Sequence, residues 1–541
     1  MSDGRVPIPT PVNEPILSYA PGSEERASLQ ARVRAMEAET AEAPMVIGGQ
    51  ETKGESTFTQ VSPHRHSREL ARVHAAGSAH VLEAVDAARG AAADWAATSF
   101  EERAAVFLKA ADLISGPYRD TINAATILGQ SKSVHQAEID AVCELVDFIR
   151  FNAFFAQEIL EEQPFSPDGM WNRMDYRPLE GFVLAITPFN FTAIAANLPS
   201  APALMGNVVV WKPSEKQALA AHYTMEVFRK AGLPDGVINL VHGDGALTAE
   251  VALAQEDLAG LHFTGSEGTF NHLWKTIGKN LDKYRTYPRI VGETGGKDFI
   301  FAHNSADVDR LVPATVRGAF EYQGQKCSAA SRMYVPKSIW GDFSKKLKAE
   351  VKKIKMGDVE DFSNFMGAVI SRKAFDKISE YIDYCKESDD AEIIAGGGYD
   401  DSKGYFIEPT VVVTTDPKFR TMKEEIFGPV LTIYIYEDEK FEETLDLCDG
   451  TSKYALTGAV WARDRYTINH MANRLKNSAG NFYINDKPTG AVVNQQPFGG
   501  ARKSGTNDKA GSMVNLYRWI SMRSIKETYA GPTDFRYPYM D

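Results

Sequence analysis

Short apolar runs, each followed by a turn or helix-start signal, restrict the fold of this chain more than any other feature. Stretches between them, such as residues 218–231, have helical periodicity. Strands that alternate with helices predict a parallel, doubly wound α/β sheet, with ligands at the carboxyl ends of its strands. The runs lie at residues 182–186, 208–211, 238–241 and 261–263.

A second α/β unit is expected after Phe301, and helices are expected before the first sheet. One helix begins after Ser23, and others fill residues 80–160. Prolines make the residues before Ser23 extended. The tail, residues 521–541, lacks a helical period. We expect it to form either an edge strand or an arm that contacts a partner subunit. In the second unit we expect a helix near 375–385 and strands near 410–413, 431–436 and 459–461.

Composition excludes several classes of protein. The net charge of −13 over 541 residues argues against a nucleic-acid partner, since phosphate binding needs a basic face. No apolar run approaches the ~20 residues of a membrane-spanning helix. The first residues resemble neither a secretory signal nor a basic transit peptide, so we expect a cytoplasmic protein. Only four cysteines are present, which favours a reduced thiol over a disulfide framework.

Cys327 and Glu293 are the residues with the clearest chemistry. Cys327 stands in Gly-Gln-Lys-Cys-Ser-Ala and Glu293 in Glu-Thr-Gly-Gly-Lys. A cysteine can form a covalent intermediate, and a carboxylate can activate water. Taken alone, Cys327 is as well explained by a buried core thiol, and Glu293 by a turn.

Two strand ends could hold a dinucleotide, although no Gly-x-Gly-x-x-Gly motif follows a first strand. At residues 263–266 a strand end is followed by a glycine and a helix-capping serine. Such a helix start can bind a pyrophosphate, but it can equally be an ordinary helix cap. At residues 212–215 a lysine and a carboxylate suit ribose hydroxyls or a surface turn.

Together these segments resemble the aldehyde dehydrogenase superfamily, in order and spacing over roughly residues 45–530. Within it the chain looks like the Δ1-pyrroline-5-carboxylate dehydrogenase branch, with Thr294 where most of the superfamily has leucine. The matching segments of the superfamily are residues 187–191, 212–215, 263–266, 293–297, 324–327, 424–429 and 497–500. Those of the branch are residues 136–140, 485–487, 495–502 and 504–509.

The resemblance implies an enzyme that oxidises L-glutamate γ-semialdehyde to L-glutamate with NAD in proline catabolism, in its monofunctional form. Cys327 would form a thioester, Asn190 would bind the oxyanion, Glu293 would activate water and Lys297 would support it. Asn190 could instead be a turn former and Lys297 a surface charge. A carboxylate at Glu215 favours NAD over NADP. The implied cofactor residues are Thr187, Lys212, Ser214, Glu215, Gly265, Ser266, Glu267, Gly268, Thr269, Glu425 and Phe427.

For the substrate, the resemblance implies an α-carboxylate held by Ser328 and by the backbone of Gly490 and Ala491. Phe498 would pack on its aliphatic chain. Related enzymes usually have serine in place of Ala491, so a weaker affinity is expected. Glu138 is placed near the substrate, with a helix-surface carboxylate as the alternative. No metal is expected, because the pair His64 and His66 lies in a polar stretch typical of a loop.

The implied organisation has an N-terminal extension (1–44), an NAD-binding domain (45–160 and 178–300), a catalytic domain (301–509) and an oligomerisation arm (161–177 and 510–541). We therefore expect a homodimer or higher oligomer, with proline dehydrogenase as a further partner. Three alternatives stay open at this point: another semialdehyde dehydrogenase, a catalytically silent binding protein, and a cofactor-free hydrolase that uses Cys327.

Overall fold

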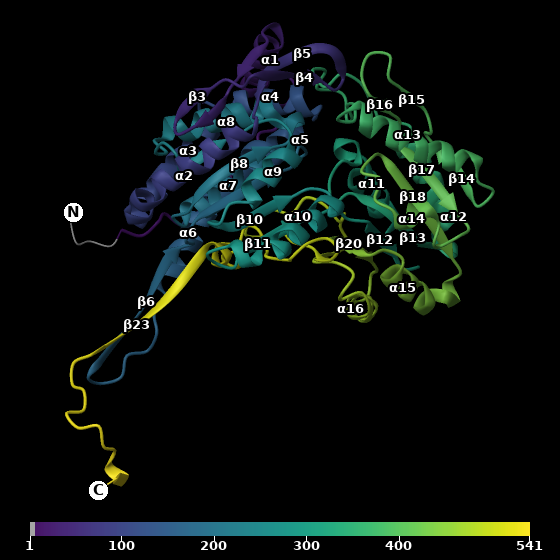
Figure 1. Ribbon diagram of the computed structural model, residues 1–541. Coiled ribbons are helices and arrows are strands. Elements are labelled where there is room, and N and C mark those ends of the chain that lie inside the picture. The colour runs from purple at the N-terminus through teal and green to yellow at the C-terminus, as the bar shows by residue number, and fades with distance from the viewer. Residues whose placement is uncertain (1–5, 541) are drawn as a thin grey trace.

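The computed structural model describes residues 6–540 and contains two seven-stranded sheets and a projecting two-stranded arm (Figure 1). The first sheet has the order β11-β10-β7-β8-β9-β2-β3. The five strands from β11 to β9 in this order run parallel to one another. This confirms the predicted doubly wound sheet. The strands are β2 (Met45–Ile47), β3 (Gln50–Thr52), β7 (Phe182–Thr187), β8 (Val208–Pro213), β9 (Ile238–Leu240), β10 (Leu258–Thr264) and β11 (Arg289–Glu293).

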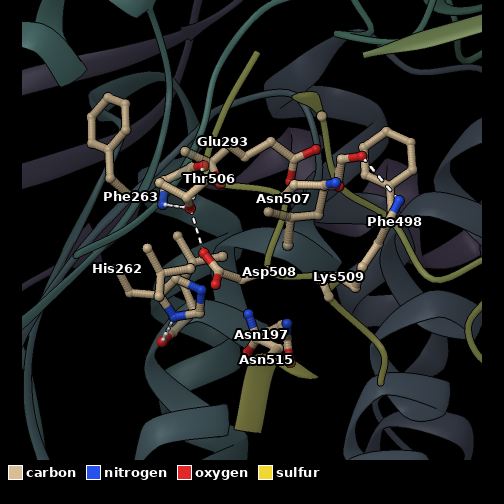
Figure 2. Close-up of a pocket in the computed structure, with 18 of the residues that line it drawn as sticks. Asn197, His262, Phe263, Glu293, Phe498, Thr506, Asn507, Asp508, Lys509 and Asn515 are labelled. Carbon is tan, nitrogen blue, oxygen red and sulfur yellow. Dashed lines mark hydrogen bonds between the residues drawn. The ribbon is translucent and has the colours of Figure 1, made fainter. Parts of the chain in front are cut away.

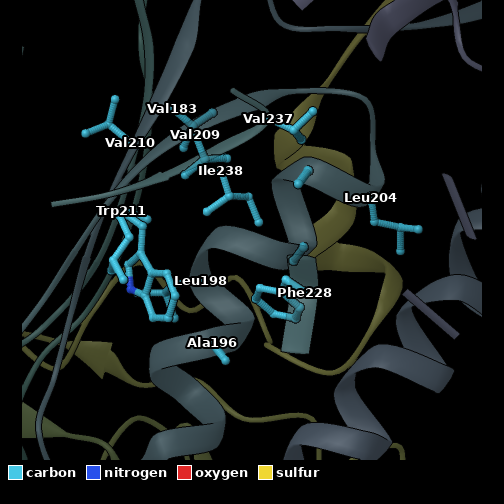
Figure 3. Close-up of a cluster of buried hydrophobic side chains, with 14 of the residues drawn as sticks. Val183, Ala196, Leu198, Leu204, Val209, Val210, Trp211, Phe228, Val237 and Ile238 are labelled. Carbon is cyan, nitrogen blue, oxygen red and sulfur yellow. The ribbon is translucent and has the colours of Figure 1, made fainter. Parts of the chain in front are cut away.

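Helices on both faces explain why these strands are continuous apolar runs. All six residues of β8 are buried, as expected for a strand covered on both sides. In Figure 3, Val183, Val209 and Ile238 of the sheet lie near Leu204 and Phe228 of helices α7 (Thr192–Leu204) and α8 (Ala218–Ala231). Helices α2 (Ser78–Ala97), α3 (Phe100–Ser115), α4 (Arg119–Gln130) and α6 (Glu144–Glu161) account for most of the predicted helical region.

The second sheet has the order β14-β17-β18-β13-β12-β20-β21, in which β14 is antiparallel and the others are parallel. It begins at Asp298, before the start expected after Phe301. Helices α11 (Val308–Phe320), α12 (Lys337–Val351) and α13 (Arg372–Glu387) pack against it. Its strands are β12 (Asp298–Ala302), β13 (Ala330–Pro336), β14 (Ala391–Ala395), β17 (Thr410–Thr414), β18 (Val430–Tyr436), β20 (Thr457–Trp461) and β21 (Asn481–Ile484).

The N-terminal helix was also correctly predicted. Helix α1 (Glu24–Ala38) is capped by Ser23, whose hydroxyl accepts a hydrogen bond from the Arg26 N–H at 3.3 Å. Its buried residues are Leu29, Val33 and Met36. A capping side chain satisfies one of the free N–H groups of the first turn, and the apolar stripe anchors the helix.

The C-terminal tail supplies a strand rather than a helix. β23 (Ile520–Thr528) pairs antiparallel with β6 (Met170–Pro178), and the pair projects from the body of the molecule in Figure 1. Trp171 and Met522 on this arm are half exposed. A long, isolated two-stranded ribbon is marginally stable by itself in water. This favours contact of the arm with a second subunit, which stays a prediction.

The histidine pair is only partly in a loop, contrary to the prediction. His64 lies in a turn after β4 (Ser56–Ser62), but His66 belongs to β5 (Arg65–Ala75). His64 is buried, and its ring lies within 4.8 Å of ligand atoms of Asp358 and Glu360. Arg65 donates to Asp358 at 2.6 Å, so a guanidinium already balances these carboxylates. The prediction that the protein needs no metal is not tested by this arrangement.

Trp211 gives a test of the first core. Its indole is fully buried and donates a hydrogen bond to the Thr187 hydroxyl at 3.0 Å. We expect Trp211→Ala to lower the free energy of unfolding by about 3–5 kcal/mol, because it leaves a cavity and an unpaired hydroxyl. Urea denaturation measures the change. Trp274→Ala, at a half-exposed tryptophan, is the control and should shift the midpoint far less.

Candidate active site

The site is built where three neighbouring parallel strands end. Thr187 ends β7, Gly265 follows β10 and Glu293 ends β11, and these strands are adjacent in the sheet. The chain passes from β7 to β8 and β9 in one direction, and later adds β10 and β11 on the other side of β7. The order therefore reverses between β7 and β10, which is where doubly wound sheets bind their ligands.

The catalytic cysteine of the prediction lies in a tight turn between α11 and β13. Cys327 is 8% exposed, and the preceding Tyr322 and Gln323 adopt left-handed backbone conformations with φ of 50° and 55°. Such conformations are costly for residues other than glycine and persist where the surroundings fix them. Here the Gln323 side-chain amide donates to the carbonyls of Ser131 at 3.0 Å and Ala368 at 2.7 Å.

Asn190 joins the cysteine turn to the first sheet. It is buried in the loop after β7, and its Nδ2 donates to the carbonyl of Gln325 at 3.0 Å. The structure thus brings the amide of Asn190 to the backbone of the turn that carries Cys327. A side-chain amide has two N–H donors, so this bond uses one of them.

Cys327 faces a cavity of about 310 Å³ together with four of the predicted substrate residues. Ser328 is buried and its hydroxyl lies 2.8 Å from that of Thr489. Gly490 has φ +91°, and a Cβ there would lie 3.0 Å from the Lys487 ammonium, so glycine fits this turn best. The four residues are Ser328, Gly490, Ala491 and Phe498.

Glu138 is a correction to the prediction, because it does not line this cavity. Its carboxylate forms an ion pair with Arg119 and accepts hydrogen bonds from Tyr19 at 2.8 Å and Asn123 at 2.8 Å. It lies in a π-helical turn (Glu138–Cys143) between α5 (Val134–Ala137) and α6. A π turn adds a residue to the helix and shifts which side chains face inward, a change that ordinary helical periodicity does not anticipate.

Glu144 takes the place expected for Glu138, and sequence reasoning missed it. It lines the Cys327 cavity, and its Oε2 is buried without a hydrogen-bond partner among the described residues. Burial and the nearby Asp140 raise its pKa well above the ordinary range of a carboxyl group, whereas Lys132 and Lys326 lower it. A buried carboxyl without a partner suits a cationic ligand.

Glu293 lines a smaller adjoining cavity of about 40 Å³ (Figure 2), which shares Glu144 and Phe498 with the larger one. This volume admits a water molecule. The Oε1 atom of Glu293 is buried with no hydrogen-bond partner in residues 6–540. Burial raises the pKa of Glu293 to about 8, and Lys509 opposes the rise.

The surroundings of the Cys327 thiol favour its neutral form. Burial raises its pKa well above the usual value, and the carboxyl of Glu293 adds to the rise, so the two groups lie within electrostatic reach. Lys297 is also fully buried, and its ammonium has no hydrogen-bond partner in the described chain. Burial lowers its pKa to about 7, and its charged neighbours are Arg332, Glu425, Asp298 and Lys377 rather than Glu293.

A groove of about 490 Å³ between the two sheets contains several predicted cofactor residues. Helix α10 (Glu267–Lys279) opens onto it, with Ser266 as its cap and Gly268 exposed in its first turn. Across the groove, the Glu425 carboxylate accepts a hydrogen bond from the Gly296 N–H at 3.0 Å. A helix N-terminus facing a carboxylate fits a dinucleotide, whose pyrophosphate seeks N–H donors and whose ribose offers hydroxyls.

The remaining cofactor candidates lie on neighbouring loops. Thr187 O accepts a hydrogen bond from the N–H of Ser214 at 3.0 Å, which joins the ends of β7 and β8. Lys212 is buried, and burial lowers its pKa while Glu215 raises it. Phe427 has φ 61° and packs edge to face against Phe189 at 5.9 Å. Gly265 is half-buried and Thr269 donates its N–H to Ser266 at 3.2 Å.

A model of the aldehyde dehydrogenase family matches residues 50–525. The chain belongs to this family. A mitochondrial Δ1-pyrroline-5-carboxylate dehydrogenase from Dictyostelium discoideum is 53% identical over 539 residues, which are 99% of this chain and 97% of the relative. The crystal structure of the same enzyme from Mycobacterium tuberculosis bound with NAD has a TM-score of 0.97 at 55% identity, covering 100% of both chains.

Another similar structure is larger. Proline utilization A from Bdellovibrio bacteriovorus has a TM-score of 0.92 at 28% identity, and the match covers 97% of this chain and 54% of that one. No helix within residues 6–540 combines the length and apolar character needed to cross a bilayer. The expected cytoplasmic location stays a prediction, since the Dictyostelium relative is named a mitochondrial protein.

The raised pKa of the thiol gives a test of the site. In the free protein we expect iodoacetamide to alkylate Cys327 more slowly than free cysteine at pH 7, because little thiolate is present. The rate should increase by about 10-fold per pH unit up to pH 9. Peptide mapping by mass spectrometry separates Cys327 from the other three cysteines, which are also buried and free. A rate independent of pH would contradict a neutral thiol.

Proposed function

We propose that this protein oxidises L-glutamate γ-semialdehyde, the hydrolysed form of Δ1-pyrroline-5-carboxylate, to L-glutamate with NAD, as the second step of proline catabolism. One observation carries the proposal: the cavity of Cys327 offers donors for a carboxylate on one side and the unpaired carboxyl of Glu144 on another. An aldehyde with both an α-carboxylate and an α-ammonium matches this arrangement. The names of the similar proteins support the same substrate.

Cys327 begins the reaction. Its sulfur attacks the aldehyde carbon after losing its proton, and a thiohemiacetal forms. The carbonyl oxygen gains negative charge in this step. The second N–H of Asn190 and the backbone N–H of Cys327 stabilise that oxygen, and the loss of one such donor costs about 10²–10³ in rate in other enzymes.

NAD, when bound in the groove, supplies the acceptor for the hydride of this carbon. The acyl group is then held on Cys327 as a thioester. Glu293 removes a proton from a water molecule in its small cavity, and the hydroxide adds to the thioester carbon. The carbon–sulfur bond breaks, which releases glutamate and returns the thiol.

The substrate is held at both charged ends of its backbone. The Ser328 hydroxyl and the N–H groups of Gly490 and Ala491 bind the α-carboxylate, and Phe498 packs on the methylene groups. Glu144 binds the α-ammonium. A cation within hydrogen-bond reach favours the ionised form of a buried carboxyl, so the substrate ammonium would supply the partner that the Oε2 atom of Glu144 lacks.

In the groove, the first turn of α10 would hold the pyrophosphate of NAD, Glu425 would hold the nicotinamide ribose, and Phe427 would contact the nicotinamide ring. Lys212 and Glu215 bind the adenine ribose, where Glu215 disfavours a 2′-phosphate. Thr187 and Ser214 would complete this side, and Lys297 would contribute positive charge near the carboxylate of Glu425. The motif residues Gly265, Ser266, Glu267, Gly268 and Thr269 form the helix start that binds the pyrophosphate.

Two subunits would associate through the arm of β6 and β23, whose exposed Trp171 and Met522 suit burial against a partner. Proline dehydrogenase is the enzyme expected to supply the substrate. The match to part of proline utilization A is the observation that supports this link. The cytoplasm is the proposed compartment.

Steady-state NADH formation tests the function. We expect turnover with Δ1-pyrroline-5-carboxylate at a kcat/KM well above that with succinate semialdehyde, which lacks the ammonium group, or with simple aldehydes. Cys327→Ala should abolish NADH formation. Equal efficiency with succinate semialdehyde would instead favour another semialdehyde dehydrogenase. Ester cleavage unaffected by NAD, without redox activity, would favour a hydrolase.

The role of Glu293 predicts a pH dependence of thioester hydrolysis. Its carboxyl is protonated below its pKa of about 8 and gains base activity as the pH rises through that value. Hydrolysis should therefore accelerate between pH 7 and 9. Glu293→Gln should slow this step by about 10²–10⁴-fold and remove the acceleration. Acid quenching followed by mass spectrometry of the acyl-enzyme measures the step separately from thiolate formation.

The role of Glu144 predicts a change of substrate preference. Glu144→Gln should lower kcat/KM for glutamate semialdehyde by about 10–100-fold, because a hydrogen bond to a charged group is lost. Succinate semialdehyde should be affected little. Glu158→Gln, at an exposed glutamate of the same helix, is the matched control. An equal loss with both aldehydes would argue against ammonium recognition.

A further inference from the structure

The N-terminal strap, defined as residues 13–16, contributes to the wall of the cavity that contains Cys327. Asn13, Glu14 and Ile16 all line this cavity, together with Cys327 and Gly490. No catalytic or binding role was predicted for the extension before residue 45. We propose that the strap determines substrate specificity and that Asn13 is a positioning residue for the loop that binds the α-carboxylate. This inference rests on the proposed function.

Asn13 connects two elements on opposite sides of the strap. Its Nδ2 donates to Asp147 Oδ2 on helix α6 at 2.8 Å and to the carbonyl of Val493 at 3.0 Å. Its Oδ1 accepts a hydrogen bond from Gln495 Nε2 at 3.0 Å. One side chain therefore links the helix that carries Glu144 to the loop that follows Gly490.

Glu14 anchors the strap on the helical side. Its backbone N–H donates to Asp147 Oδ1 at 2.7 Å. Its carboxylate forms ion pairs with Arg119 at 2.7 Å and Arg150 at 2.8 Å, and 10% of its side chain is exposed. Arg119 also donates to the carbonyl of Pro15 at 2.8 Å. These contacts fix the position of the strap, so that Asn13 acts as a rigid support for the loop.

The supported loop has no regular strand or helix of its own. Residues 489–492 are irregular, with φ +91° at Gly490, and residues 493–495 form a turn, with φ +67° at Asn494. Within it, the Val492 N–H donates to Gln496 Oε1 at 3.0 Å. A loop of this kind moves readily unless side chains from other elements hold it. Asn13 supplies two of these external contacts, at Val493 and Gln495.

Loss of the support should weaken carboxylate binding without harming the chemistry. The Cys327 turn is held separately, by Gln323 and by Asn190. A displaced loop moves the N–H groups of Gly490 and Ala491 away from the α-carboxylate. The KM for glutamate semialdehyde should therefore rise while kcat changes little. The kinetic constants for an aldehyde without a carboxylate should not change.

The experiment compares Asn13→Ala with Val12→Ala, a change at an exposed residue of the same segment. Kinetic constants are measured for glutamate semialdehyde and for butanal. For Asn13→Ala we expect the KM for glutamate semialdehyde to rise about 10-fold with kcat within about 2-fold of wild type, since hydrogen bonds that hold the loop are lost. Butanal kinetics should be unchanged in both variants, and Val12→Ala should match wild type throughout.

Gln495→Ala removes one of the three bonds and keeps the test available if Asn13→Ala does not fold. It should raise the same KM by about 2–5-fold. An equal loss for both aldehydes, or an unchanged KM in Asn13→Ala and Gln495→Ala, would overturn the inference. Failure of the wild-type protein to oxidise glutamate semialdehyde would count against the proposed function instead, so the two failures are distinguishable.

Discussion

The close passage of Gly295 and Gly296 past the Cys327 turn is the constraint on which the site depends. These glycines connect β11 of the first sheet to β12 of the second. A Cβ at Gly295 would lie 1.9 Å from Glu425 Oε1, and one at Gly296 would lie 2.4 Å from the carbonyl of Cys327. Gly296 therefore has no room for a side chain, because the Cys327 carbonyl belongs to the backbone, whereas a side chain at Gly295 would displace the Glu425 carboxylate. The approach brings Glu293, at the end of one sheet, within electrostatic reach of Cys327, which precedes a strand of the other.

Burial at this junction explains the unusual titration of the site. Taking Cys327, Glu293 and Glu144 out of water disfavours their charged forms and raises the pKa of each. Lys297 responds in the opposite sense, because its charged form is the cation. Neutral buried groups can become charged when ligands bind. Electrostatic interactions with them then act in the reacting state, and the low polarity of the site makes these interactions stronger. Perturbed groups of this kind cluster at functional sites.

Much of the fold could be predicted because burial leaves a local signature. Runs such as 208–211 became strands covered on both faces, and residues 218–231 became helix α8, which ends at Gly232 in a left-handed cap. Other features have no such signature. Tyr322 and Gln323 adopt positive φ although neither residue type favours it. Glu144 lines the Cys327 cavity and Glu138 does not, and the π-helical turn Glu138–Cys143 sets the register of the helix there.

The sequence by itself determined the alternation of strands and helices, the strand ends near Thr187, Lys212 and Gly265, and the residue types available for chemistry. These follow from local patterns of apolar residues, caps and turns. Only the tertiary structure decided which distant residues meet: Asn190 with the Cys327 turn, Glu144 with the substrate cavity, and Asn13 with the loop after Gly490. Such meetings depend on long-range packing and on hydrogen bonds between segments far apart in the chain, and neither leaves a periodic trace in the sequence.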